Sequence, residues 1–351
     1  MNTLVSRLLL TIPIASGCPG CDRGALPAQA RAADAPSSSS TAATLRAPAC
    51  RERPDGAAFC DGNRVRVCRN GQPDTTSTCW SIERCDKDTA ACVPNCLHGT
   101  VYIPATGPAG FTMGRGRLKA RDRPHTVVLT RPFCMDETEV TAGAYARCIE
   151  AGACKEPYKW DPWASYPRFP DHPVNLVSQT KAAAYCAWNG QQLPTEAQWE
   201  WAATGGDRRE WPWGNDEPTC ENGYLDFTPL GAPKSTPGGD VGCHGGGPSP
   251  VKAHPKGAKP WPTGNLYDLA GNVWEWTRDF AQPYPSETQS DPAISQVPGK
   301  PDWTLFAIRG GGWNRSATGC TVWFRGEATR SYQVPGLGFR CVRESRGPEH
   351  E

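Results

Sequence analysis

The sequence predicts an α+β domain with a small mixed β core, few helices and many loops, preceded by a small disulfide-rich module. Residues 266–340 mix glycine, tryptophan and charged residues at a density that neither an ordinary core helix nor a core strand requires. Three segments between residues 141 and 205 carry the capping signals of helices. Seven cysteines fall within residues 50–96, a stretch too short to build a sufficient hydrophobic core without disulfides.

Length and composition limit the possible functions. The 351 residues accommodate one domain of about 250 residues and a smaller part. The 37 Lys and Arg balance 36 Asp and Glu, so the charge indicates no nucleic-acid partner. The 37 Gly and 35 Pro favour a loop-rich fold. The 17 cysteines, mostly at short spacings, predict an oxidising compartment and therefore export.

Residues 1–17 have the features of an export signal, with Arg7 ahead of a short apolar run at residues 8–15. This run is too short to span a bilayer as a helix. The segment Ala15-Ser16-Gly17-Cys18 resembles the lipobox of bacterial lipoproteins, with Ala15 where leucine is usual. We therefore expect a lipid on Cys18 that anchors the protein to a membrane, in the periplasm or at the cell surface. The alternative is a plain signal peptide and a secreted protein.

Residues 18–49 predict a disordered tether, because their Ala, Ser and Pro cannot bury enough apolar surface to offset the entropy of ordering. Residues 50–96 form the predicted module. Its cysteines are Cys50, Cys60, Cys68, Cys79, Cys85, Cys92 and Cys96. Any six of them permit fifteen pairings, and their spacing does not match a zinc site. Residues 64–68 predict a strand that runs into a turn at Asn70-Gly71, in a structural or partner-binding module.

We expect the main domain over residues 97–345, followed by a tail at 346–351. Residues 126–129 predict a strand. Thr141 is the predicted cap of a first helix, which places Ala144, Tyr145, Cys148 and Ile149 on one side. Cys148 and Cys154 flank a tight loop and predict a local disulfide.

Two more helices follow from similar signals. Ser178 starts the second, which runs through Trp188 and stops at Gly190. Thr195 and Gln198 form the capping box of the third, which ends near Gly205. The pattern predicts helices on one side of a mixed, irregular β core.

Seven segments of the main domain carry a resemblance to one family. They are VYIPATGPAGFTMG (101–114), ETEVTAGAY (137–145), HPVNLVS (172–178), AAAYCAWNGQQLPTEAQWEWAA (182–203), WPWGND (211–216), LYDLAGNVWEW (266–276), and RGGGW (309–313) with GFR (338–340). Through them the chain resembles the formylglycine-generating enzyme, or sulfatase-modifying factor, family over residues 99–343. The resemblance implies a compact domain related to C-type lectins.

The resemblance also implies calcium. Asp268, Gly271, Val273 and Glu275 match the positions where family members bind one structural calcium ion, and carboxylates around a glycine turn suit that cation. The alternative is a turn held by hydrogen bonds alone. A second calcium site would use Asn222, Gly223 and Asp240.

One disulfide is implied in the same way. Cys186 and Cys341 match a pair found in the family enzymes, and their bond would close a loop of about 155 residues. Cys220 and Cys243 could similarly close the long loop between them. Four cysteines have no obvious mate, namely Cys21, Cys96, Cys134 and Cys320.

The surroundings of Cys320 indicate whether the chain can act as an oxidase. In the family oxidases, two cysteines five positions apart bind copper(I) and activate dioxygen. Here Cys320 matches the second, and Arg315 occupies the position of the first. A thiolate pair suits copper(I), whereas a guanidinium is permanently charged and repels a cation about 4 Å away by about 4 kcal/mol at an effective dielectric near 20. Gly312 and Gly336 also replace a serine and an asparagine of the family pattern.

Other features of the family site persist. Trp274 and Arg330 match residues of the substrate-peptide groove, and Trp313 and Arg340 belong to matching segments. The alternatives are core packing for Trp274 and structural ion pairs for the arginines. For Cys320 the alternatives are a disulfide or a reactive thiolate next to Arg315.

We therefore expect an exported member without a competent copper site that binds a peptide or another ligand. The alternative is a formylglycine-generating oxidase that uses O2 to convert a cysteine of a substrate protein to formylglycine. A different reaction on the same scaffold is a third possibility, for which the sequence names no residues beyond the groove.

Overall fold

A computed structural model describes residues 50, 53–70, 72–116, 122–223, 247–294 and 304–345. The predicted signal segment, tether and tail lie outside these ranges, as do Cys18, Cys21, Asp240 and Cys243. In the described ranges, no helix combines the length and the apolar character that crossing a bilayer requires.

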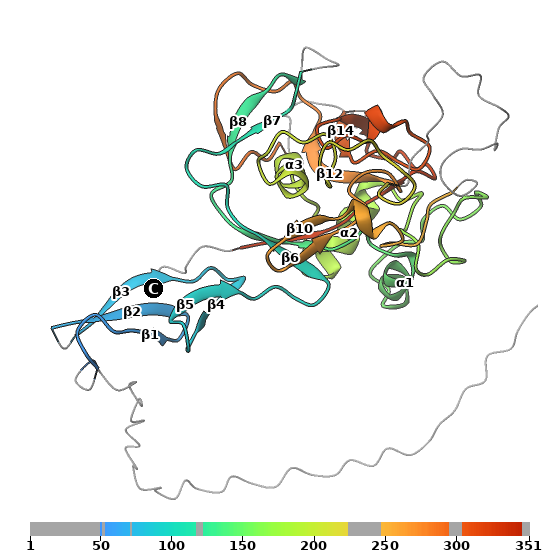
Figure 1. Cartoon of the computed structure of the whole chain (residues 1–351). Helices are drawn as coiled ribbons and strands as arrows, with labels where there is room; N and C mark the ends of the chain where they lie inside the picture. The colour runs from blue at the N-terminus through green and yellow to red at the C-terminus, as the bar shows by residue number, and fades with distance from the viewer. Residues whose placement is uncertain are drawn as a thin grey trace, which may run out of the picture. The chain divides into compact units, whose positions relative to one another are not determined.

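The disulfide-rich module consists of short antiparallel strands (Figure 1). Strands β1 (Ala58–Asp61), β2 (Arg64–Arg69) and β3 (Gln72–Thr78) form one sheet, and β4 (Glu83–Asp86) and β5 (Ala91–Pro94) form a hairpin. The strand predicted at residues 64–68 is confirmed as part of β2. Asn70 has a φ of +51°, a left-handed conformation that suits the turn into β3.

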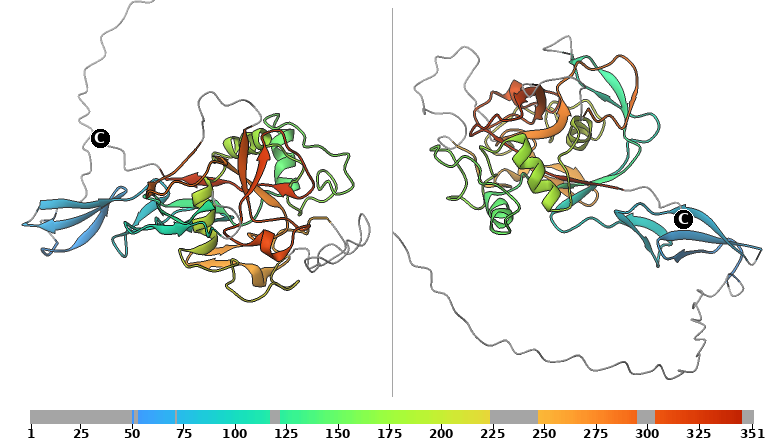
Figure 2. Two further views of the ribbon diagram at one scale, coloured as in Figure 1. Left: turned by 90° about the horizontal axis from the view of Figure 1, so that it is seen from above. Right: turned by 180° about the vertical axis from the view of Figure 1, so that it is seen from behind.

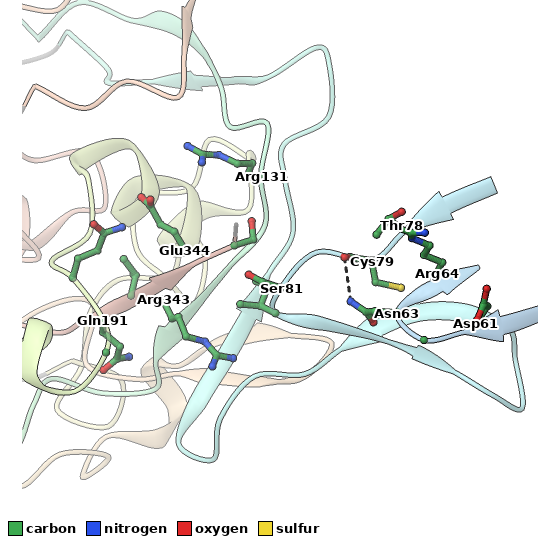
Figure 3. A pocket seen from close by; sticks show the side chains of 16 residues that line it. Asp61, Asn63, Arg64, Thr78, Cys79, Ser81, Arg131, Gln191, Arg343 and Glu344 are labelled. Atoms are coloured by element: carbon green, nitrogen blue, oxygen red, sulfur yellow. Dashed lines mark hydrogen bonds between the residues drawn. The ribbon is translucent and has the colours of Figure 1, made fainter. Parts of the chain in front are cut away.

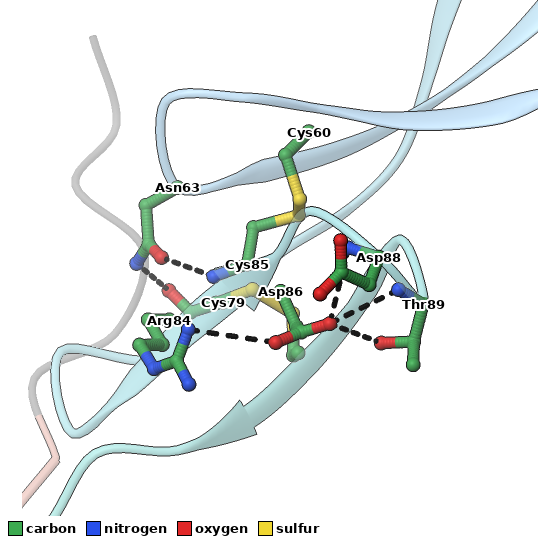
Figure 4. The surroundings of a disulfide bond; sticks show 9 residues. Cys60, Asn63, Cys79, Arg84, Cys85, Asp86, Asp88 and Thr89 are labelled. Carbon is green, nitrogen blue, oxygen red and sulfur yellow. Dashed lines mark hydrogen bonds and ion pairs between the residues drawn. A yellow bond between two sulfur atoms is a disulfide. The ribbon is translucent and has the colours of Figure 1, made fainter.

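Three disulfides hold the module together and supply what its small core lacks. They join Cys50 to Cys68, Cys60 to Cys85, and Cys79 to Cys92. The Asn63 side chain lies beside two of them, where it donates to the carbonyl of Cys79 (3.2 Å) and accepts from the amide of Cys85 (3.0 Å) (Figure 4). The connectivity that the sequence left open is thereby defined.

A fourth disulfide leaves the module and joins Cys96 to Cys134, in strand β9 (Phe133–Asp136) of the main domain. The two cysteines are 38 residues apart in the sequence. They meet because β9 pairs with β6 (Thr100–Ile103), which begins shortly after Cys96. The spacing of the cysteines in the sequence does not predict this disulfide.

The described residues contain three α-helices, and each begins at the predicted cap. They are α1 (Ala142–Glu150, capped by Thr141), α2 (Gln179–Trp188, capped by Ser178) and α3 (Glu196–Thr204, capped by Thr195). The predicted capping box of α3 is present, and Gly205 ends this helix with a φ of +69°.

The strands of the main domain form small sheets. They are β6, β7 (Phe111–Met113), β8 (His125–Val128), β9, β10 (Lys259–Trp261), β11 (Gly264–Leu266), β12 (Trp274–Phe280), β13 (Gln289–Ser290), β14 (Leu305–Arg309), β15 (Gly326–Thr329), β16 (Leu337–Gly338) and β17 (Val342–Glu344). Their orders are β15-β14-β12-β16, β13-β8-β7, β17-β9-β6 and β10-β11. Parallel and antiparallel pairs both occur, so the predicted mixed β core is confirmed.

Strand β12 is buried on both faces and divides the core. Trp274 and Trp276 belong to the apolar cluster that includes α1 and α2, while Glu275 and Asp279 bond to residues of α3. Helices α2 and α3 both contact β12, and the strand lies between them in the view of Figure 1. The orange and red strands of the same sheet can be followed in the two further views (Figure 2). Helices α2 and α3 therefore lie on opposite faces of β12, and the expectation of helices on one side of the β core is wrong.

Candidate functional site

A cavity of about 560 Å³, called the groove below, lies along β14, β15 and the loop that follows the glycine turn. Trp274, Ile308, Phe324 and Leu337 give it apolar walls, and Arg315 and Arg325 add positive charge. Trp274 is only 6% exposed and therefore also packs in the core. A Cβ at Gly326 would lie 2.9 Å from the Trp274 ring, so a larger residue there would displace the indole.

The glycine turn is tightly folded over Cys320. Gly310 and Gly311 have φ values of +92° and +75°, which favour glycine. A Cβ on Gly311 would lie 2.3 Å from the Cys320 Sγ, so no side chain fits there. Cys320 ends a 3-10 helix (Ala317–Cys320) and is fully buried.

Cys320 carries a thiol, and the alternative of a disulfide is wrong. Its Sγ lies 3.8 Å from the carbonyl oxygens of both Gly312 and Arg315. The Arg315 side chain is exposed and lines the groove, whereas Cys320 itself does not line it. The two family positions for copper thus hold a buried thiol and an exposed guanidinium.

Of the four expected groove residues, the structure places Trp274 in the cavity. Trp313 is 6% exposed and packs against Trp163, with ring centroids 5.6 Å apart. Arg330 is exposed and lies over the Phe306 ring, 5.2 Å from its centroid. Neither residue lines the groove.

The fourth groove assignment, Arg340, is wrong because its side chain is fully buried. Its Nε and Nη2 donate to the two carboxylate oxygens of Glu275 at 2.7 Å each, and Nη2 also reaches the Tyr267 carbonyl at 2.8 Å. The Trp199 indole donates to the same carboxylate at 2.8 Å. The structural ion pair is therefore the correct alternative for Arg340. It also neutralises Glu275, which the resemblance assigns to calcium.

Next to this pair lies a carboxylate that the sequence did not single out. Glu139 is 1% exposed, and neither of its carboxylate oxygens has a hydrogen-bond partner among the described residues. Burial, and then the charge of Asp268, raise the pKa of Glu139 well above its usual value. Burial also raises the pKa of Asp268 to about 6. Nothing in the segment ETEVTAGAY marks which of its glutamates is buried.

A cation would relieve this accumulation of negative charge. Among the described residues, no three His, Cys, Asp or Glu side chains converge as metal ligands. Calcium accepts backbone carbonyl oxygens as well as carboxylates, and the turn with Gly271 and Val273 follows Asp268 directly. The donor set of Glu139, Asp268 and turn carbonyls fits calcium better than a soft metal.

The second set of expected calcium ligands is only partly described. Asn222 uses its side-chain oxygen to accept from the Thr219 amide at 2.7 Å. The Gly223 amide donates to the Thr219 carbonyl at 2.9 Å. Asp240 lies outside the described residues. Cys220 is disulfide-bonded, and its expected mate Cys243 also lies outside them. The disulfides Cys148–Cys154 and Cys186–Cys341 are both present.

Behind the groove lies a buried network of charges that the sequence did not predict. Arg325 is 3% exposed and pairs with Glu196 at 2.9 Å. Arg309 pairs with Glu200 and lies 3.7 Å from Glu196. Asp279 accepts from the Glu196 amide at 2.8 Å, and burial raises its pKa to about 7. Glu196 and Glu200 lie four residues apart on α3 and therefore face the same side of the helix, and Arg325 connects this network to the groove that it lines.

Comparison with known proteins identifies the family of the chain. Residues 91–345 match the family model described as the sulfatase-modifying factor enzyme 1-like domain. This match covers well over half of the chain. The chain belongs to the sulfatase-modifying factor enzyme 1-like family.

Relatives within the sulfatase-modifying factor family include a protein named as an inactive formylglycine-generating enzyme and one named as a formylglycine-generating enzyme. The chain is 35% identical over 186 residues to the inactive Cα-formylglycine-generating enzyme 2 of Mus musculus, covering 51% of each protein. It is 34% identical over 180 residues to the formylglycine-generating enzyme of Bos taurus, covering 50% of this chain and 45% of that protein. The chain thus spans about half the length of the curated relatives it matches.

A solved structure supports the fold alone. Treponema denticola variable protein 1 aligns with a TM-score of 0.50 at 23% identity, covering 69% of this chain and 94% of that one. The predicted family fold is thereby confirmed. The copper and calcium assignments remain predictions.

Proposed function

We propose that this sulfatase-modifying factor family member is an exported binding module, which holds a peptide in the groove without oxidising it. One observation carries the proposal: the exposed Arg315 stands in the groove where the family oxidases have the first copper cysteine. The wall residues Trp274, Ile308, Phe324 and Leu337 supply the apolar surface that a peptide side chain would occupy.

Two features of Cys320 argue against a copper(I) site. A single thiolate leaves copper without the linear pair that stabilises it, and the Arg315 charge opposes any cation nearby. The Cys320 side chain is fully buried under the glycine turn. A metal would have to enter through a turn in which even one added methyl group has no room.

Calcium belongs to the same proposal. Glu139 and Asp268 would hold the ion with carbonyl oxygens of the turn at Gly271 and Val273, and the ion would supply the charge that these buried carboxylates lack. Glu275 would contribute only indirectly, because Arg340 already neutralises it. The role of such an ion would be structural.

Export is supported by the disulfides, which include four in or at the module and persist only in oxidising compartments. The expected lipid on Cys18 would retain the protein at a membrane. Secretion of a soluble form is the alternative for the same leader.

The experiment that tests the proposal is titration of the purified protein with copper(I) against a competing chelator, together with an oxidation assay on a cysteine-containing sulfatase-type peptide. We expect no stoichiometric tight binding and no aldehyde. An Arg315→Cys variant is the matched comparison, because it restores the missing thiol and thereby separates the effect of the lost ligand from the effect of the burial of Cys320. Tight 1:1 binding by the unmodified chain, or formation of formylglycine, would establish the oxidase instead.

A further inference from the structure

A cavity of about 1160 Å³, called the junction cavity below, lies between the module and one edge of the sheet β17-β9-β6 (Figure 3). The module lines it with the turn between β1 and β2 and with the residues between β3 and β4. The main domain lines it with Arg131, residues 190–192 and residues 342–345. It shares no lining residue with the groove.

Bonds on both sides hold the junction cavity in place. The Cys96–Cys134 disulfide joins the end of the module to β9. The Tyr102 hydroxyl donates to the Glu83 carboxylate at 2.6 Å, and Arg343 Nη2 donates to the Asn95 carbonyl at 3.0 Å. The walls are therefore connected by a covalent bond and two hydrogen bonds before any ligand arrives, which lowers the ordering cost of binding.

Two arginines of the junction cavity, Arg131 and Arg343, have hydrogen-bond donors without a partner among the described residues. Arg131 is exposed and has no ion-pair or hydrogen-bond partner among the described residues. The Nε of Arg343 is buried without a partner in the same ranges. Figure 3 shows both side chains, together with Arg64 on the opposite, module side.

The carboxylates of the cavity wall do not compensate these charges, since they are paired elsewhere. Asp61 lies 2.6 Å from Arg66 Nε, and Glu344 lies 2.6 Å from Arg278 Nη2. Neither Arg66 nor Arg278 lines the cavity. The junction cavity therefore has a net positive charge that favours an anionic ligand.

The backbone of β17 has hydrogen-bonding groups that face the junction cavity. Val342 exchanges two backbone hydrogen bonds of 2.8 Å with Gln192, whereas the Cys341 carbonyl and the Ser345 amide point to the β9 side. Since alternate residues of a strand point to opposite sides, Glu344 directs its amide and carbonyl toward the Gln192 side. In the antiparallel register of the Gln192–Val342 bridge, Gly190, which follows α2, lies opposite Glu344. No backbone hydrogen bond joins these two residues, and both line the cavity, so the cavity lies between them.

A side-chain group points to a ligand as well. Ser345 is 1% exposed, lines the junction cavity, and its Oγ has no hydrogen-bond partner among the described residues. Buried hydroxyl groups in folded proteins are normally hydrogen-bonded. The Ser345 hydroxyl at the cavity wall is therefore available to form a hydrogen bond with a bound ligand.

We propose that the junction cavity binds an extended acidic peptide segment of a partner protein. The segment adds a short strand beside Glu344, in the manner of β-strand addition, and places its carboxylates against Arg131 and Arg343. A peptide fits better than an acidic saccharide, because none of the lining residues is aromatic and the backbone groups of Glu344 match those of a peptide. The module thus acquires a role: it forms the second wall of a binding site.

The test uses the full exported chain and fluorescence anisotropy with a labelled, end-blocked peptide of alternating Glu and Val. A Lys/Val peptide is the charge control. Arg131→Gln is the primary variant, because this exposed side chain has no partner in the described part of the chain whose loss would disturb the fold. Arg147→Gln, on the exposed side of α1, is the matched control for net charge.

We expect the Glu/Val peptide to bind and the Lys/Val peptide not to bind. Arg131→Gln weakens binding about tenfold, which is the effect of one well-placed charge, and Arg147→Gln leaves it unchanged. Methylation of the central peptide nitrogen weakens binding through the lost backbone hydrogen bond. No binding of the Glu/Val peptide, or equal losses in the two variants, overturns the proposal. Tighter binding of an acidic oligosaccharide through Arg131 also overturns it, in favour of a saccharide site.

Discussion

The guanidinium of Arg340 and the carboxylate of Glu275 meet in a two-point ion pair, with both contacts at 2.7 Å and both side chains fully buried. The pair ties β12 to the segment GFR just before β17, and Trp199 of α3 bonds to the same carboxylate. Three parts of the domain that are distant in the sequence are thereby held at one point.

Removal of the Arg340 charge should destabilise the fold strongly. Arg340→Met leaves the Glu275 carboxylate buried without its cation, which lowers the free energy of unfolding by about 3–5 kcal/mol. Urea denaturation measures the loss. Arg330→Met is the control, since this exposed arginine stacks on Phe306 and its loss costs less than about 1 kcal/mol. Equal losses in the two variants would contradict the structural role of the pair.

Calcium should stabilise the protein through Glu139. At about a hundredfold excess over its Kd, a ligand that binds only the folded state adds about 2.7 kcal/mol. We expect calcium to raise the melting temperature of the unmodified protein and a chelator to lower it. Glu139→Gln abolishes this response, whereas the exposed Glu150→Gln keeps it. A calcium response that survives Glu139→Gln would exclude Glu139 as a ligand.

Asp279 should make the protein less stable at higher pH. Burial raises its pKa in the folded state from 3.8 to about 7, so between these values the folded state binds more protons than the unfolded state. The free energy of unfolding therefore falls as pH rises through this window. Unfolding of the unmodified protein and of Asp279→Asn, compared at pH 5 and pH 8, isolates the contribution, because the variant cannot titrate. Parallel pH dependences would contradict it.

The two disulfides of the main domain should differ in their effect. Cys186–Cys341 spans 155 residues and Cys148–Cys154 only 6. Loop closure in the unfolded chain then predicts losses of about 5 and about 2 kcal/mol when each pair is replaced by alanine. Denaturant unfolding of the two double variants gives the comparison. A larger loss for the short loop would show that native packing rather than chain entropy dominates.

The glycine turn should tolerate no side chain. Gly311→Ala places a Cβ 2.3 Å from the Cys320 Sγ at a φ of +75°, so we expect a loss of several kcal/mol, about the cost of overpacking plus a left-handed residue. Gly319→Ala is the matched control, because its nearest neighbour would lie 3.6 Å away. Thermal melting distinguishes them. Similar melting temperatures would show that the turn relaxes easily.

Local signals in the sequence predicted the elements well. Thr141, Ser178 and Thr195 each cap a helix as expected, because capping depends on residues three positions apart. The strand at residues 126–129 is present as β8, shifted by one residue.

Predictions that depended on tertiary pairing were less successful. The sequence around Arg340 does not distinguish a groove residue from a buried one. Only the structure, which places Glu275 of β12 beside it, shows that Arg340 is buried. Glu139 and the charges around Glu196 were missed for the same reason, since burial of a carboxylate depends on what packs over it. The mate of Cys96 depended on the pairing of β6 with β9.

The Cys96–Cys134 bond also determines what a protease could release. A single cut between Cys96 and the start of β6 would separate the module from the main domain in the peptide chain, yet the Cys96–Cys134 disulfide would keep the two fragments together. If the protein is anchored through Cys18 as proposed, release of the main domain would then require either a cut before Cys50 or a reductant in addition to the cut.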